Sequence, residues 1–250
     1  MTAPRRRVLV TGSSRGIGAA IARELAAAGF SVLLHARERV DDARALAMEL
    51  GGEAAPFGAD LADRAACDRL FAWADEGGPV DALVNNAGIY VQASFLDPDD
   101  DAFARALDDQ LALNFVASAW LARRFALAAT RRGLAHARIV HVGSRVGFRG
   151  EAGAAAYAAS KAAQINLVRS LAVELAAVRI GVFGVAPGWV ETAMAREAVA
   201  ARRAEIEASI PLGRVASPED CAAVVAFLLS DKAAYLSGVV VDINGASYFH

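Results

Sequence analysis

Cysteine is scarce in this chain, and its two cysteines are far apart. Cys67 and Cys221 lie in separate, helix-like segments. The sequence has no C-x-x-C motif, and no histidine stands near either cysteine at the spacing of a metal ligand. We therefore expect two structural thiols and no metal site.

An excess of charge of one sign is also missing. The chain has 26 Lys and Arg against 28 Asp and Glu, which gives a formal net charge of −2 at pH 7. Such a protein has no overall electric field that would attract a nucleic acid or an anionic lipid surface. We expect neither as a partner.

Long apolar runs are absent as well. Arg5, Arg6 and Arg7 precede only the short run VLV, which is much shorter than the core of a signal peptide. No uninterrupted apolar stretch approaches the roughly 18 residues that a membrane span requires. The sequence therefore predicts a soluble, cytoplasmic protein.

What is present is a high apolar content in an alternating pattern. Of the 250 residues, 56% are hydrophobic, enough for the core of a single domain over residues 1–250. Expected strands alternate with alanine-rich helices, which is typical of an α/β, doubly wound parallel sheet (Rossmann fold). The strands are expected at Val8–Val10, Val32–His35, Ala82–Asn85, Ile139–Val142, Gly181–Ala186 and Val239–Ile243. The helices are expected at Ile21–Ala28, Asp41–Leu50, Ala65–Asp75, Phe103–Arg131, Ala155–Ala177 and Pro218–Leu229.

The first expected strand leads into a glycine-rich turn and a helix. The turn has the spacing Gly12-x-x-x-Gly16-x-Gly18. Glycine lets the backbone turn sharply and approach a pyrophosphate, which the free N–H groups at the start of the helix then bind. The spacing differs from the commoner G-x-G-x-x-G, and taken alone it fits an ordinary strand-to-helix turn equally well.

A tyrosine and a lysine lie four residues apart in the segment AAYAASKAA. Residues at i and i+4 share a helix face, so Lys161 can approach the Tyr157 phenol and favour its ionised form. Such pairs also occur by coincidence on many surface helices. Ser144 and Asn114 precede the pair in the chain.

These motifs occur together in a fixed order. The glycine turn, the segment NNAG, Ser144, the Tyr157/Lys161 pair and the segment PGWVET follow one another from about Arg6 to about Gly245. In this combination the chain resembles the short-chain dehydrogenase/reductase family. The resemblance implies hydride transfer between a nicotinamide and a carbonyl or secondary alcohol, as in 3-oxoacyl-carrier-protein reductases.

The resemblance also implies a role for each of the four residues. Ser144 would polarise the carbonyl and Tyr157 would protonate it, as a carbonyl reduction requires. Lys161 would tune Tyr157 and bind the nicotinamide ribose, and Asn114 would hold a water that links Lys161 to solvent. An asparagine that interrupts a helix can instead bond backbone carbonyls, so this alternative for Asn114 stays open.

Charge at the end of the second expected strand predicts NADP(H). Ala36 stands where NAD-dependent relatives carry aspartate, and Arg37 follows it. Arg15 and Arg37 together can clamp the 2′-phosphate of NADP, although both could be solvated surface residues and Glu38 would weaken their field.

The remaining cofactor contacts follow from the resemblance. Asp60 would contact the adenine, residues 86–88 would line the adenosine side, and residues 187–192 would hold the carboxamide. The full expected set is Gly12, Ser14, Arg15, Gly16, Ile17, Gly18, Arg37, Asp60, Leu61, Asn86, Ala87, Gly88, Tyr157, Lys161, Pro187, Gly188, Val190 and Thr192.

The substrate is left open. A lid-like segment at about residues 189–214 and the stretch Tyr90–Leu96 are expected to line its pocket, and Arg145 beside Ser144 hints at an anionic or strongly polar molecule. The resemblance implies a small or carrier-bound carbonyl compound as the substrate. An acidic carrier protein could dock on Arg123, Arg124, Arg131 and Arg132, which could equally be a solvated helix face.

Two functions of different classes remain. The intact Asn114, Ser144, Tyr157 and Lys161 set favours an NADP(H)-dependent ketoreductase, and the alternative is a catalytically silent, nucleotide-binding sensor or scaffold. The resemblance further implies a homo-oligomer, a dimer or a homotetramer. The ending DINGASYFH departs from the family's usual aspartate-glycine-glycine, so subunit contacts there can differ.

Overall fold

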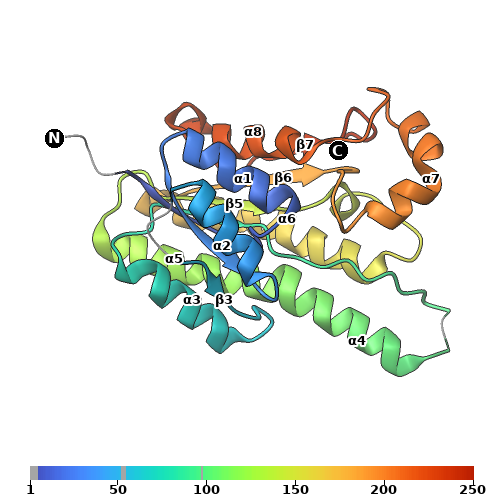
Figure 1. Ribbon diagram of the computed structural model, residues 1–250, viewed down its shortest axis with the longest axis horizontal. Helices are drawn as coiled ribbons and strands as arrows, with labels where there is room; N and C mark the ends of the chain where they lie inside the picture. The colour runs from blue at the N-terminus through green and yellow to red at the C-terminus, as the bar shows by residue number, and fades with distance from the viewer. Residues whose placement is uncertain (1–4, 52–54, 97) are drawn as a thin grey trace.

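Seven parallel strands form one sheet in the order β3-β2-β1-β4-β5-β6-β7 (Figure 1). The computed structural model describes residues 5–51, 55–96 and 98–250. The strands are β1 Arg7–Val10, β2 Ser31–Ala36, β3 Phe57–Gly58, β4 Ala82–Asn85, β5 Arg138–Val142, β6 Gly181–Pro187 and β7 Val240–Ile243. The strand order reverses between β1 and β4, which confirms the predicted doubly wound sheet.

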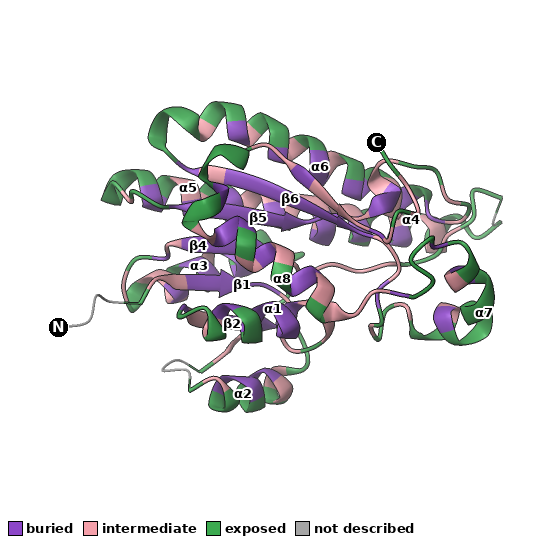
Figure 2. Ribbon diagram, turned by 90° about the horizontal axis from the view of Figure 1, so that it is seen from above, coloured by how far each residue is buried: buried purple, intermediate pink, exposed green. Residues whose placement is uncertain are grey.

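Helices cover both faces of the sheet. Cores formed with α1, α2 and α8 lie on one face, and a core formed with α3, α5 and α6 lies on the other (Figures 1 and 2). The helices are α1 Gly16–Ala27, α2 Val40–Glu49, α3 Arg64–Glu76, α4 Asp100–Gln110, α5 Ser118–Arg132, α6 Ala155–Leu175, α7 Arg196–Ala208 and α8 Pro218–Leu229.

Strand β5 shows why the apolar runs become central strands. All five of its residues are buried, with Ile139 in the core against α3, α5 and α6, and Val140 and Val142 in the core against α1 and α8. A strand buried on both faces needs side chains that leave water on each side, which is why aliphatic residues of β5 face both cores. Each such aliphatic side chain contributes about 1.5–3 kcal/mol on burial.

Three features differ from the sequence-based expectation. Strand β3 is only Phe57–Gly58, too short to leave an apolar run. Helix α7 lies within the expected lid and has few buried residues, Val199 and Ile206 among them, so its apolar pattern is weak. The single helix expected at Phe103–Arg131 is α4 and α5 joined by a π-helical turn, Leu111–Ala117.

The same continuous helical segment, Asp100–Arg132, is long and apolar enough to cross a membrane by length and composition alone. In the structure its apolar side chains have another partner. Leu121 and Phe125 are fully buried in the core between α3, α5 and α6. The hydropathy of this segment is therefore accounted for by packing on the sheet.

Charges on the outer side of α5 are partly neutralised by α3. Arg124 forms a bidentate bond with Asp68, at 2.6 and 3.1 Å, and Arg132 pairs with Asp75 at 2.7 Å. Two of the four arginines considered for carrier docking are thus already paired within the chain. Arg123 and Arg131 are exposed.

His141 in β5 generates a prediction about stability. Its ring is buried, and neither ring nitrogen has a hydrogen-bond partner within the described residues. Burial, helped by the nearby Lys161 charge, lowers the pKa of His141 to about 3. In the unfolded chain the His141 imidazole takes up a proton below about pH 6.5, whereas in the folded chain it stays neutral down to about pH 3. The free energy of unfolding therefore falls as the pH drops from about 6.5 toward 3.

For His141→Leu we expect a weaker acid destabilisation. Between about pH 7 and pH 5 the parent should lose about 2 kcal/mol of unfolding free energy that the variant keeps. Urea unfolding at the two pH values measures the difference, with His136→Leu, an exposed histidine, as the control. Equal pH slopes in the parent and His141→Leu would contradict the assigned cause.

Candidate active site

The loop between β1 and α1 is shaped for close approach by a ligand. Gly16 has a φ of 55°, in the left-handed region that favours glycine. A Cβ on Gly18 would lie 2.3 Å from the Gly12 carbonyl oxygen, so no larger residue fits there. Helix α1 begins at Gly16 with no side-chain cap, which leaves its first N–H groups available to an anion such as a pyrophosphate.

Hydrogen bonds hold this loop in place from the neighbouring strands. The Asn86 side chain donates to the carbonyls of Thr11 and Gly12, at 2.8 and 3.0 Å, and the Thr11 hydroxyl accepts from the N–H groups of Asn86 and Ala87. On the β2 side the Gly12 N–H donates to Nδ1 of His35 at 3.1 Å. The loop is therefore rigid before any ligand arrives.

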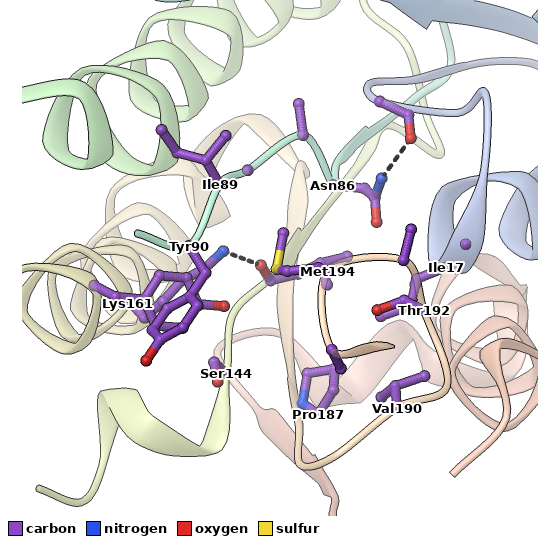
Figure 3. A pocket seen from close by; sticks show the side chains of 18 of the residues that line it. Ile17, Asn86, Ile89, Tyr90, Ser144, Lys161, Pro187, Val190, Thr192 and Met194 are labelled. Carbon is purple, nitrogen blue, oxygen red and sulfur yellow. Dashed lines mark hydrogen bonds between the residues drawn. The ribbon is translucent and has the colours of Figure 1, made fainter. Parts of the chain in front are cut away.

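A cavity of about 850 Å³ extends from this loop along the carboxyl ends of the strands. Figure 3 shows Ile17, Pro187, Val190 and Thr192 on one side of it and Tyr90, Ser144 and Lys161 on the other. The whole expected cofactor set lines this cavity: Gly12, Ser14, Arg15, Gly16, Ile17, Gly18, Arg37, Asp60, Leu61, Asn86, Ala87, Gly88, Tyr157, Lys161, Pro187, Gly188, Val190 and Thr192. The glycine cradle and the long cavity fit a dinucleotide.

Three arginines lie at the end of the cavity beside β2. Arg15, Arg37 and the unpredicted Arg39 all line it and are exposed. Arg37 forms an ion pair with Glu38 at 2.7 Å, the neighbour that the sequence predicted would weaken its field. Arg39 pairs with Asp42. Arg15 forms no ion pair within the described residues, so its charge is the most available to an added phosphate.

Ser144 and Tyr157 meet at the opposite end. Their side chains are joined by a hydrogen bond that favours the phenolate, yet burial outweighs it and raises the pKa of Tyr157 to about 12. The expected lowering of this pKa is therefore wrong for the structure as it stands. Tyr157 is a protonated phenol at neutral pH, and the Tyr90 ring packs edge-on against it at 5.1 Å.

Lys161 explains this correction, because its ammonium group bonds elsewhere. Nζ donates to the Val142 carbonyl at 2.8 Å and to Oε1 of Gln164 at 3.1 Å, and it lies 5.8 Å from the centre of the Tyr157 ring. Burial lowers the pKa of Lys161 to about 7. A buried amine that is easily deprotonated near neutrality is a feature of functional sites.

Asn114 does not line the cavity but lies fully buried behind it. Its Oδ1 accepts from the Ile89 N–H at 2.9 Å, and its Nδ2 donates to the Ile89 carbonyl and to Ser160 Oγ, both at 3.0 Å. The π-helical turn places this side chain between the segment after β4 and α6. The backbone-bonding alternative is thus present in the structure.

The two expected substrate-lining segments contribute unequally. From residues 90–96, Tyr90 and Gln92 line the cavity, whereas Phe95 and Leu96 are exposed. The expected lid contributes more, including Trp189, Met194, Ala198, Arg202, Glu205, Ile206 and Ser209. Helix α7 has a small core of its own, formed by Val199, Ile206, Ile210 and Val215.

Sequence reasoning missed three residues of this site. His35, which supports the glycine loop, ends an apolar strand and gave no separate signal. Arg39 lies two residues beyond Arg37, where a longer reading of the charge pattern could have found it. Gln164 stands one helical turn after Lys161, a spacing that could have indicated contact.

Comparisons with known proteins agree with this geometry. A family model described as Enoyl-(Acyl carrier protein) reductase matches residues 12–246. The chain is 39% identical to the 3-oxoacyl-[acyl-carrier-protein] reductase FabG of Escherichia coli (strain K12), over 96% of both chains, and 35% identical to an acetoacetyl-CoA reductase of Shinella zoogloeoides, over 98% of this chain and 99% of that protein.

A similar solved structure is described as an NAD(P)-dependent gluconate 5-dehydrogenase from Beutenbergia cavernae with NADP bound at low occupancy. It is 38% identical, with a TM-score of 0.88, and the match covers 97% of this chain and 96% of that one.

The contacts of Asn114 predict a structural cost that is separate from catalysis. Asn114→Ala would leave the partly buried N–H and carbonyl of Ile89 without their side-chain partner, and we expect the unfolding free energy to fall by about 1–3 kcal/mol. Urea denaturation measures this, with Glu24→Ala on the exposed side of α1 as the control. A loss below about 1 kcal/mol would argue against the anchoring role.

Proposed function

Because the chain belongs to the short-chain dehydrogenase/reductase family, we propose that it is an NADP(H)-dependent oxidoreductase that transfers a hydride between nicotinamide and a ketone or secondary alcohol. One observation carries the proposal. Ser144, Tyr157 and Lys161 converge on one end of a cavity whose other end is formed by the glycine loop and unpaired Arg15. This arrangement brings together an acid, Tyr157, a hydrogen-bond donor for the developing oxyanion, Ser144, and a loop that can hold a dinucleotide.

The protonation states favour the direction of ketone reduction. Bound NADPH supplies the hydride for the carbonyl carbon. As negative charge develops on the carbonyl oxygen, the Ser144 hydroxyl donates to it and Tyr157 gives it a proton. A phenol whose pKa is raised to about 12 is fully protonated at neutral pH, as an acid must be before the step.

Lys161 and Asn114 act behind Tyr157 in this proposal. After the proton leaves Tyr157, the Lys161 ammonium stabilises the phenolate and would bind the nicotinamide ribose. Asn114 Oδ1 has one protein donor, the Ile89 N–H, so it retains acceptor capacity for a water between Lys161 and solvent. This water is the route by which the acid would be reprotonated.

For the substrate we propose a ketone of the 3-oxoacyl type. The E. coli relative is named for a 3-oxoacyl carrier-protein substrate and the Shinella relative for acetoacetyl-CoA. A small or carrier-bound acyl ketone is therefore the first class to test. Docking of a carrier on α5 would depend on Arg123 and Arg131, because Arg124 and Arg132 are already paired.

We further propose a single-domain, cytoplasmic homo-oligomer, a dimer or tetramer. Helix α6 supports this, because its outward side exposes small and apolar residues, namely Ala155, Ala159, Ala162 and Val173. The alanines at the start of this face allow close approach of a second helix, and Asn166 and Arg169 further along it can supply polar contacts. Analytical ultracentrifugation of the full chain tests the oligomeric state.

A screen of ketones and secondary alcohols, followed by NADPH absorbance, tests the activity. Turnover of a ketone supports the enzyme. If tight NADPH binding occurs with no turnover across 3-oxoacyl thioesters, simple ketones and sugar acids, the chain is instead a silent NADP(H)-binding sensor or scaffold.

Tyr157→Phe tests the acid. The change removes one acidic proton and almost no volume, so kcat should fall by at least about 10³-fold, at the level of a lost general acid, while NADPH affinity stays within about twofold. Steady-state rates and fluorescence titration measure the two quantities. Turnover of Tyr157→Phe within threefold of the parent would refute the assignment of the acid.

Lys161→Met should lower turnover and also weaken NADPH binding, which separates the ribose role of Lys161 from the acid role of Tyr157.

The cofactor preference can be inverted at the end of β2. We expect Ala36→Asp with Arg37→Leu to favour NADH, because the change adds an acceptor for the ribose hydroxyls and removes a phosphate contact worth about 1.5–3 kcal/mol, or roughly 10- to 150-fold. Titration of both cofactors measures this. Arg44→Leu, an arginine of α2 paired with Asp41, is the control. A double variant that still prefers NADPH would contradict the role of Arg37 and place the selectivity on Arg15 and Arg39.

A further inference from the structure

A buried positive charge without a carboxylate partner lies directly after Ser144. Arg145 is only 6% exposed, and within the described part of the chain it forms no ion pair. Its Nη1 donates to the Ser247 hydroxyl at 2.7 Å, and its Nε has no partner there. A buried guanidinium held by one neutral hydroxyl is costly unless a ligand anion completes its contacts.

The surroundings of Arg145 belong to the catalytic end of the cavity. Arg145 lines it together with Ser144 and Tyr157, and Arg149 and Glu151 line it as well. Arg145, Arg149 and Glu151 together carry a single net positive charge, and the Lys161 ammonium at the same end is already bonded to the Val142 carbonyl and to Gln164. Elsewhere in the cavity Arg202 of α7 is compensated, since it forms a bidentate bond with Glu205.

The C-terminal tail, residues 244–250, holds this cation in position. Ser247 bonds Arg145, and the Tyr248 hydroxyl donates to the Phe148 carbonyl at 3.0 Å. The His250 ring stacks on Phe148 at 3.7 Å, nearly parallel to it. A guanidinium fixed in advance loses little side-chain entropy when it binds an anion.

We propose that Arg145 is the anion-binding residue of the substrate pocket, and that the preferred substrate is a ketone carrying a carboxylate. This inference rests on the proposed function, whose carbonyl position is beside Ser144 and Tyr157. A monocarboxylate matches the single net positive charge, whereas a phosphate dianion would be opposed by Glu151. Within the proposed 3-oxoacyl class, Arg145 thus selects the small free acid over a neutral ester and over a carrier-bound thioester of the same ketone.

The test compares acetoacetate with methyl acetoacetate as substrates of the parent, Arg145→Met and Arg145→Lys, with NADPH. The parent should prefer acetoacetate. In Arg145→Met the KM for acetoacetate should rise at least about tenfold, as expected for loss of a charge-assisted bond, while the value for the ester changes less than about threefold. Arg145→Lys keeps the charge and should retain part of the preference.

Two further variants and a check of folding complete the test. Arg23→Met, whose guanidinium pairs with Glu49 far from the cavity, should leave both substrates unaffected. Ser247→Ala should lower the acid-to-ester selectivity by a smaller factor than Arg145→Met, because it loosens the guanidinium without removing it. NADPH titration and thermal unfolding show whether each variant is folded.

Calorimetric titration of acetoacetate separates the two proposals. If the parent reduces neither compound, the 3-oxo ketone activity fails, yet acetoacetate binding that is lost in Arg145→Met still supports the anion subsite. If the parent reduces both equally, or Arg145→Met keeps the preference for the acid, the subsite is wrong while the oxidoreductase stands.

Discussion

The active-site end of this molecule depends on one buried ammonium group. Lys161 reaches from α6 to the Val142 carbonyl at the end of β5 and, one helical turn on, to Gln164. That bond fixes α6 against the carboxyl end of β5 and so fixes where Tyr157, on the same helix, lies relative to Ser144. The cost of burying the charge appears as the lowered pKa of Lys161, and the same low-polarity surroundings keep Tyr157 protonated.

A second set of hydrogen bonds fixes the glycine loop at the other end of the cavity. Thr11, Asn86 and His35 connect the glycine loop to β4 and β2, and the loop's own glycines leave no room for side chains. Because both ends are held by the backbone of one sheet, their separation is constant. A long, rigid ligand that spans the carboxyl ends of the strands is the natural occupant.

The substrate pocket is lined by elements that pack separately from this frame. Helix α7 has its own small core, and the C-terminal tail packs on the segment after Ser144. Both can change in sequence without disturbing the Lys161 contact. Arg145 is an example. It follows Ser144 in the chain, yet its guanidinium is oriented by Ser247 of the C-terminal tail, about a hundred residues further along the sequence.

The sequence by itself determined the doubly wound sheet and the glycine loop, because two-sided burial makes strands apolar and because backbone approach to a phosphate requires glycine at particular positions. The rest of the expected cofactor set and the roles of Ser144, Tyr157 and Lys161 came from the resemblance to the family, and the structure brings those residues to one cavity. Only the tertiary structure decided the protonation of Tyr157, the partners of Asn114, the pairing of Arg37 with Glu38 and the burial of Arg145. Each of these depends on distances between segments remote in the chain or on side-chain orientation, and the pKa of a group depends on how many atoms exclude water from it.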